Sequence, residues 1–261
     1  MLGLCRWSIA ILFAVALTTG CTKSSTEEKS SSVQTIELGQ ILSASNLTLA
    51  SKAEQLAKAA EQLLTVQGFV YANDVADLAL AQDASNLRAR FIKAILVPVM
   101  VQKGIFARLA PLAAKDARAQ EEYSNGLAEL QSKYPNSTLK TFLLDGVADI
   151  RDESDVQNYV ESLVEGFAAI RKFSKDNKDQ NLTVLASDTF LTIMKRRYEE
   201  SCIVVRVDPW TYRIECPSPV NLMEITLSRA DFEGLQQIAA GYELYFALYN
   251  SYDVNGAGSS S

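Results

Sequence analysis

Histidine is absent from the 261 residues of this chain. Histidine is the side chain most used as a general base near neutral pH, and it is the commonest ligand for transition metals. Its absence excludes Ser-His-Asp and Cys-His catalytic sites. We therefore expect a protein that is not an enzyme and that holds neither a metal ion nor a cofactor.

Phosphate-binding loops and basic patches are missing as well. The 12 glycines are scattered, and none lies in the strand-to-helix setting that a phosphate loop requires. Basic residues cluster only at Lys195-Arg196-Arg197, and the net charge is −6. Nucleic-acid binders concentrate basic side chains to displace counterions, so this class of partner is excluded. Adjacent carboxylates such as Glu121 and Glu122 do not face one another on a helix, which leaves a carboxylate-based hydrolase as a minor alternative.

Long hydrophobic runs are scarce, and the one at the start of the sequence is short. Arg6 precedes an apolar stretch from Ile9 to Leu17, which is too short to span a bilayer as a permanent helix. This layout is typical of a secretory signal. The whole chain is 48% hydrophobic and 21% charged, the composition of an ordinary folded protein, so we expect its body to fold.

The residues from Leu17 to Cys21 carry a resemblance to a known class. Gly20-Cys21 resembles the lipobox of bacterial lipoproteins, although Thr18 stands where that class usually has leucine and Leu17 lies one place further out. The resemblance implies that the Cys21 thiol receives diacylglycerol and that residues 1–20 are a signal peptide removed by cleavage. A plain secreted protein and an uncleaved anchor are the alternatives.

Residues 21–32 would then form a flexible, lipid-anchored tether, because the stretch after Cys21 is polar, rich in serine and has nothing to bury. In lipoproteins an aspartate directly after the lipidated cysteine favours retention in the inner membrane, and Thr22 occupies that place here. The resemblance therefore implies a lipid anchor in the outer membrane that faces the periplasm. Inner-membrane anchoring is the alternative.

Two of the four cysteines, Cys202 and Cys216, remain for the folded body once Cys5 leaves with the signal and Cys21 is lipidated. The β-prone runs on either side of Asp208-Pro209-Trp210 predict a β-hairpin over residues 202–216. If Val207 pairs with Thr211, Cys202 lies opposite Cys216 at a spacing that a disulfide can bridge. An oxidising compartment favours that bond, and two reduced buried cysteines are the alternative.

The rest of the body shows helical periodicity, so the predicted fold is all-α, with this hairpin as its only β-structure. The folded domain is expected over residues 33–253, with a disordered tail at 254–261. The predicted helices are Ala53–Leu64, Val70–Ala81, Asn86–Lys103, Ile105–Leu112, Ala117–Lys133, Leu139–Ile150, Asp155–Phe173, Asn181–Glu200 and Ala230–Tyr252.

The first two predicted helices fit one repeat of a known kind. Residues 53–86 have the length of a tetratricopeptide repeat and resemble one in their helix-packing positions, which are Leu56, Ala59, Ala60, Leu63, Ala72, Ala76 and Ala79. The aromatic residues and the closing proline of the family are missing. Tyr134-Pro135-Asn136-Ser137 resembles a joint between two such units, but the spacing is irregular. The resemblance implies antiparallel helical hairpins in an irregular α-solenoid, and an ordinary alanine-rich hairpin is the alternative.

An aromatic stripe on the last predicted helix is the candidate binding surface. It consists of residues at helical spacing whose rings could stack and whose hydroxyls could form hydrogen bonds: Tyr242, Tyr245, Tyr249 and Tyr252. Such a stripe either packs in the core or lines a groove for a peptide, lipid or small ligand.

These expectations together favour a periplasm-facing lipoprotein whose helical scaffold binds another envelope protein or a peptide. The alternative is an accessory lipoprotein that binds a small or apolar ligand for an envelope transporter. In that respect it would be similar to the tetratricopeptide-like lipoproteins of TRAP-type transporters. An apolar cavity between the helices would favour the second function, and an open surface would favour the first.

Overall fold

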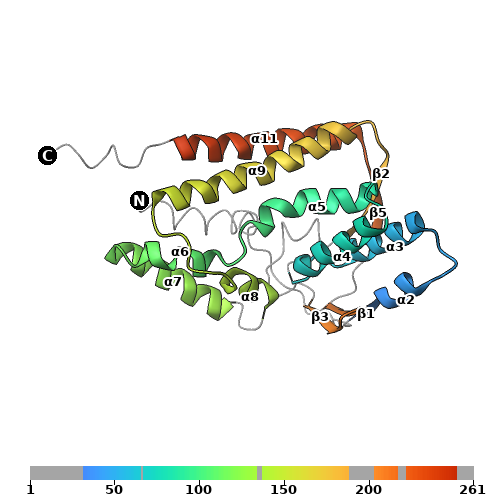
Figure 1. Cartoon of the computed structure of the whole chain (residues 1–261), viewed down its shortest axis with the longest axis horizontal. Coiled ribbons are helices and arrows are strands. Elements are labelled where there is room, and N and C mark those ends of the chain that lie inside the picture. The colour runs from blue at the N-terminus through green and yellow to red at the C-terminus, as the bar shows by residue number, and fades with distance from the viewer. Residues whose placement is uncertain (1–31, 66, 134–136, 188–202, 217–221, 252–261) are drawn as a thin grey trace, which may run out of the picture. The chain divides into compact units, whose positions relative to one another are not determined.

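The computed structural model describes residues 32–65, 67–133, 137–187, 203–216 and 222–251. These residues are mostly helical, with two small antiparallel sheets (Figure 1). The predicted signal peptide, Cys21, most of the tether, Cys202, Tyr252 and the predicted tail lie outside the described residues. The all-α prediction is correct in its helical content and wrong in limiting β-structure to one hairpin.

The chain divides into two compact units. The sheet unit comprises the described residues within 32–96 and 179–228, and the helical unit comprises those within 97–178 and 229–251. Helix α5 (Leu87–Met100) contributes its first ten residues to the sheet unit and its last four to the helical unit.

The helices of the sheet unit are α2 (Leu38–Ser43), α3 (Leu49–Gln62), α4 (Phe69–Gln82) and the first part of α5. Thr48 caps α3, since its side chain accepts a hydrogen bond from the Ser51 N–H. The predicted packing positions of α3 and α4 are buried, with Leu56, Ala60 and Ala79 fully inaccessible to solvent. Small side chains on both helices allow their backbones to approach closely, so α3 and α4 form the predicted hairpin.

The larger sheet has the strand order β1-β4-β3, formed by β1 (Ser32–Glu37), β4 (Thr211–Cys216) and β3 (Ile203–Asp208). The predicted hairpin is therefore present as β3 and β4. Ile203 pairs with Glu215 in the expected register, but Asp208 rather than Val207 pairs with Thr211. The turn explains the difference, because the Asp208 carboxylate accepts a hydrogen bond from the Trp210 N–H at 2.8 Å and a β-bulge lies between Arg206 and Asp208.

The smaller sheet corrects one predicted helix. Residues 182–187 form strand β2 (Leu182–Ser187), which pairs with β5 (Leu222–Leu227), whereas the sequence predicted a helix over Asn181–Glu200. A short apolar run such as this has no periodicity that separates a strand from a helix. Pairing with β5, far along the chain, decides its conformation.

The helical unit contains α6 (Ile105–Ala113), α7 (Ala117–Lys133), α8 (Thr138–Leu144), α9 (Glu153–Asn177) and α11 (Arg229–Ser251). Prediction placed a helix over Leu139–Ile150, but α8 ends at Leu144. The chain then turns because Gly146 lies directly against Gly104, and the Ile150 N–H donates to the Arg108 carbonyl at 3.0 Å.

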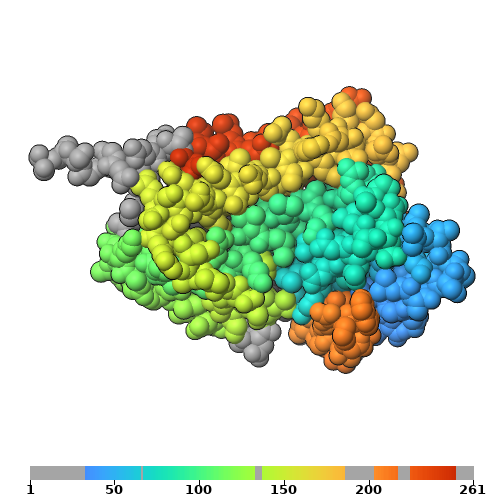
Figure 2. All heavy atoms as spheres, in the orientation of Figure 1, coloured from blue at the N-terminus to red at the C-terminus, as the bar shows by residue number. Residues whose placement is uncertain are grey.

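Helices α9 and α11 form a long antiparallel pair (Figure 1), and their atoms lie directly against each other in the space-filling view (Figure 2). Asp152 and Asp155 form a capping box at the start of α9. The seam between the two helices contains the ring pairs Phe173–Phe232 and Phe167–Tyr242. This seam positions α11 as a helix that uses one of its sides for packing.

One described stretch, Leu87–Ala113, is long and apolar enough to cross a membrane by length and composition alone. It is not one uninterrupted helix, because Gly104 adopts a left-handed conformation between α5 and α6. Arg88 also lies at its start with a buried, ion-paired side chain. Of the apolar window within this stretch, 28% is buried.

The close contact between Gly104 and Gly146 provides a test of the turn before α6. A Cβ atom on Gly104 would lie 2.3 Å from the Gly146 Cα, and the φ angle of Gly104 is +66°. We expect Gly104→Ala to lower the free energy of unfolding by about 2 to 4 kcal/mol, through backbone strain and the clash. Chemical denaturation measures this change.

The matched control is Gly234→Ala in α11, where an added Cβ meets no atom within 4 Å. This substitution should raise the free energy of unfolding by about 0.5 to 1 kcal/mol, because alanine favours a helix more than glycine does. Equal effects of the two substitutions would contradict the described contact.

Candidate interaction surface and a buried ion pair

The inner face of α11 packs on α9. Phe232, Ala239 and Phe246 follow one another at seven-residue steps and are almost completely buried. Leu235, Tyr242 and Tyr249 extend the same face and are half-buried. The alternating steps of three and four residues are those of a helix-packing seam.

The predicted tyrosine stripe is divided between the inner face and the opposite side of the helix. Tyr242 stacks on Phe167 with the ring centroids 4.7 Å apart and the planes 18° apart, so it belongs to the seam. Tyr249 is half-buried, and this burial raises the pKa of its hydroxyl. Tyr245 is exposed and contacts Phe246 edge-on at 5.3 Å. Tyr252 lies outside the described residues.

The opposite side of α11, which we call the outer face, is exposed and apolar. Ile238, Leu244, Tyr245 and Leu248 retain 59%, 61%, 38% and 52% of their accessible surface. The other exposed residues of the face are Gln237, Ala240, Gly241 and Ala247. Gly241, Leu244, Tyr245 and Leu248 have the i, i+3, i+4, i+7 spacing of one helical stripe.

The outer face carries no charge. Between Glu233 and Ser251 the only charged residue of α11 is Glu243, whose carboxylate accepts a hydrogen bond from Arg171 of α9 at 2.6 Å and so lies toward the seam. An exposed helix face normally carries charged side chains, and a contiguous apolar patch on a protein surface is typical of an interaction site. The outer face is therefore the candidate interaction surface.

Sequence reasoning noticed the tyrosines and missed the residues that make this face apolar, which are Ile238, Leu244 and Leu248. A signal was present, because Glu243 is the only charged residue of α11 between Gly234 and Asn250. A helix of that kind is expected to be buried all round. An exposed side on such a helix therefore indicates an interaction surface, but only the structure shows which side is exposed.

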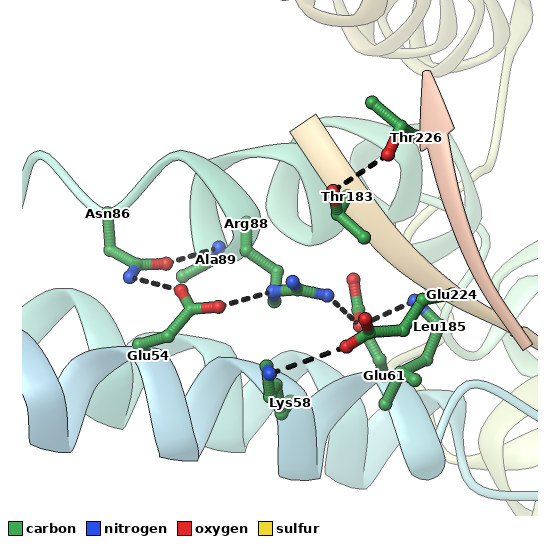
Figure 3. A network of polar contacts seen from close by, with 10 residues as sticks. All are labelled: Glu54, Lys58, Glu61, Asn86, Arg88, Ala89, Thr183, Leu185, Glu224 and Thr226. Atoms are coloured by element: carbon green, nitrogen blue, oxygen red, sulfur yellow. Dashed lines mark hydrogen bonds and ion pairs between the residues drawn. The ribbon is translucent and has the colours of Figure 1, made fainter. Parts of the chain in front are cut away.

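A second unusual feature is a buried ion pair in the sheet unit (Figure 3). Glu61 of α3 and Arg88 of α5 are both buried, and Arg88 Nη1 lies 2.5 Å from Glu61 Oε2. The Leu185 N–H of β2 donates to the same carboxylate oxygen at 2.9 Å. Arg88 Nε donates to Glu54 at 2.9 Å, and Asn86 donates to the other oxygen of Glu54. The ion pair therefore joins α3, α5 and β2.

Burial dominates the electrostatics of Glu61. Desolvation raises the pKa of its carboxyl group from 4.5 to about 7, against the opposing effects of the Leu185 hydrogen bond and the Arg88 charge. Glu61 Oε1 has no hydrogen-bond partner. The charge of Glu54, which is bonded to the same arginine, adds to the raised pKa.

The remaining predicted site residues fall in two groups. Cys216 is buried at the end of β4, while Cys202 and Cys21 lie outside the described residues.

Within the described residues, no three cysteine, aspartate or glutamate side chains gather closely enough to hold a metal ion.

Comparisons with protein-family models, with curated proteins and with solved structures find no match to this chain.

The raised pKa of Glu61 predicts a pH-dependent stability. Because the folded-state pKa lies above the unfolded-state value, the folded state binds an extra proton between about pH 4.5 and pH 7. The free energy of unfolding should therefore fall as the pH rises through this window, by about 3 kcal/mol. The sequence contains no histidine, so few other groups titrate near pH 6. Chemical denaturation at several pH values measures the effect.

Glu61→Gln should flatten this pH dependence, since glutamine keeps the shape of the side chain and does not titrate. The control is Glu54→Gln, which removes a partly exposed carboxylate bonded to the same arginine. It should leave most of the pH dependence in place. A wild-type protein whose stability is constant between pH 5 and pH 7.5 would refute the assignment.

Proposed function

We propose that this chain is a lipid-anchored protein of the bacterial envelope that binds a partner protein through the outer face of α11. The uncharged, exposed outer face is the observation that carries the proposal. Helix-in-groove and helix-on-helix recognition use an apolar stripe with this spacing. The partner contributes an apolar helix, because a charged partner would lose hydration with no opposite charge to compensate it.

The proposed location in the cell envelope rests on residues 9–22 of the sequence. The apolar stretch Ile9–Leu17 and the lipobox-like Gly20-Cys21 support export and lipidation of Cys21. Thr22 supports sorting to the outer membrane, with the folded body in the periplasm. A tether up to residue 32 would leave the body free to meet a partner near the membrane.

The scaffold that presents the outer face is proposed to be tetratricopeptide-like only in part. Helices α3 and α4 overlap residues 53–86, although α3 begins at Leu49, and the buried Ala60, Ala72, Ala76 and Ala79 support one repeat-like hairpin. The two small sheets and the α9–α11 pair differ from such a repeat. An irregular helical scaffold with one repeat-like hairpin fits these features better than a regular solenoid does.

We also propose the disulfide between Cys202 and Cys216. The observed pairing of Ile203 with Glu215 supports the register from which the sequence predicted this bond, and Cys202 itself lies outside the described residues. Cys216 is buried, and an oxidising periplasm favours oxidation of two opposed cysteines. The bond would fix the open end of the β3–β4 hairpin.

The alternative function, ligand binding as an accessory lipoprotein of a TRAP-type transporter, has less support. It needs an apolar cavity between helices. In α9 and α11 the aromatic rings of Phe167, Tyr242 and Phe246 instead stack on one another across the seam. An enzymatic function has least support, because the chain has no histidine.

The lipid anchor is tested by Cys21→Ala. We expect this variant to lose the acyl modification and to leave the membrane fraction or accumulate as precursor, because one thiol carries the anchor. Mass spectrometry and membrane fractionation measure the two effects. A variant that fractionates with membranes as the wild type does, without lipid on either protein, would refute the anchor.

The binding surface is tested by site-specific photo-crosslinking in intact envelopes. A photoreactive amino acid at Leu244 should give a discrete adduct with a protein, because this position lies at the centre of the outer face. The control places the same probe at Val147, an exposed apolar residue of the helical unit outside α11. Adducts at neither position, or equally at both, would remove the support for the outer face as a binding surface.

A further inference from the structure

The occupant of the outer face can be inferred from its charge and shape, given the proposed function of that face. A lipid surface is disfavoured, because helices that lie on membranes carry lysine and arginine beside their apolar side. The only basic residue in α11 is Arg229, which is paired with Glu233 at 2.9 Å. The chain as a whole carries a net charge of −6, which opposes binding to anionic lipids.

The order of large and small residues on the outer face makes it complementary to itself. An antiparallel pair of α11 helices with a two-fold axis at Gly241 sets Leu248 opposite Gly234 and Leu244 opposite Ile238. Each leucine at position 248 then has space, since an added Cβ at Gly234 meets no atom within 4 Å. Two copies of Gly241 face each other at the axis and allow the backbones to approach closely.

Charge also favours a second copy of this chain. Two negatively charged molecules repel one another unless the contact surface is free of charge. Between Gly234 and Leu248 the outer face fulfils this condition, since Glu243 is held toward α9 by Arg171. Glu233 lies directly before this span and is paired with Arg229 of its own helix. Helix α7 of the helical unit does not, because its exposed side carries Glu121 and the ion-paired Arg118.

We propose that two copies of this chain pair through the outer faces of α11, antiparallel and related by a two-fold axis at Gly241. A two-fold contact uses the same surface on both copies and closes after two subunits. The pairing buries Ile238, Leu244, Tyr245 and Leu248 of both copies against one another.

The contact between the two helices is small. Helix α11 has 23 residues, which corresponds to a length of about 34 Å. One helix from each copy gives an interface at the small end of the range for specific complexes, so the dimer is weak in dilute solution. Lipid anchors would raise the local concentration of the copies on one membrane and favour pairing there.

Cysteine crosslinking of the whole protein in its native membrane tests the geometry. Gly241→Cys should crosslink to itself with a short bifunctional thiol reagent, because the two copies of residue 241 meet at the axis. Gln237→Cys should not, because its two copies are offset by eight residues, or about 12 Å, along the helices. The wild type controls for its own cysteines.

A mixture of two variants extends the test. Gly234→Cys and Leu248→Cys should crosslink to each other when both variants are produced in one cell, and neither should crosslink when produced alone. Self-crosslinking of Gln237→Cys as strong as that of Gly241→Cys, or a failure of the mixed pair to link, would overturn the antiparallel dimer.

A charged substitution supplies an independent measurement. Leu244→Glu should weaken self-association at least tenfold in sedimentation equilibrium of the purified protein, without lowering its melting temperature, because this side chain is exposed in the monomer. Val147→Glu should leave self-association unchanged. Equal self-association of both variants would refute the dimer.

Failure of this inference can be distinguished from failure of the proposed function. If a probe at Leu244 gives an adduct with a different protein while the cysteine variants give no self-crosslinks, the outer face binds a partner that is not a second copy. If the probe gives no adduct of any kind, both proposals are wrong.

Discussion

The seam between α9 and α11 is the interaction on which the surface of the helical unit depends. Phe232, Ala239 and Phe246 hold α11 on α9 through one side of the helix. The other side of α11 carries Ile238, Leu244 and Leu248, and packing on α9 leaves these side chains exposed. The outer face is thus the exposed apolar side of a helix that packs on α9 through its other side.

The sheet unit follows a different constraint, which is the cost of burying charge. Glu61 and Arg88 lose their hydration in the core, and removal of one partner would leave the other charge unpaired. The Leu185 N–H adds a hydrogen bond from β2 to this ion pair. The arrangement specifies how α3, α5 and β2 meet, because an apolar replacement could pack in several ways, whereas these groups form their bonds in one geometry.

Much of the helical structure could be predicted from the sequence because its signals are local. The repeat-like alanines indicated α3 and α4 to within a few residues, and α6, α7, α9 and α11 also lie where periodicity placed them. Long-range contacts caused the errors. Strand β2 depends on β5, and the end of α8 depends on the contact between Gly146 and Gly104.

In the candidate site too, the local sequence predicted the positions of the residues, whereas contacts with distant residues decide their exposure. Helical spacing located the tyrosines of α11, but the neighbour of each tyrosine decides whether it packs or remains exposed. Phe167 of α9 makes Tyr242 a packing residue, and no sequence rule connects these two positions. The outer face could be found only after one side of α11 had been assigned to the seam.

The larger sheet shows why exposure in α11 differs from exposure elsewhere in the described structure. Strand β3 also presents apolar side chains, at Ile203, Val205 and Val207. Its backbone is interrupted by the bulge between Arg206 and Asp208, and bulges and charges on an edge strand oppose open-ended pairing with other chains. The outer face of α11 has no corresponding protection, since no charge interrupts it. A self-complementary helix contact closes after two copies, so such a face can remain unprotected without leading to open-ended assembly.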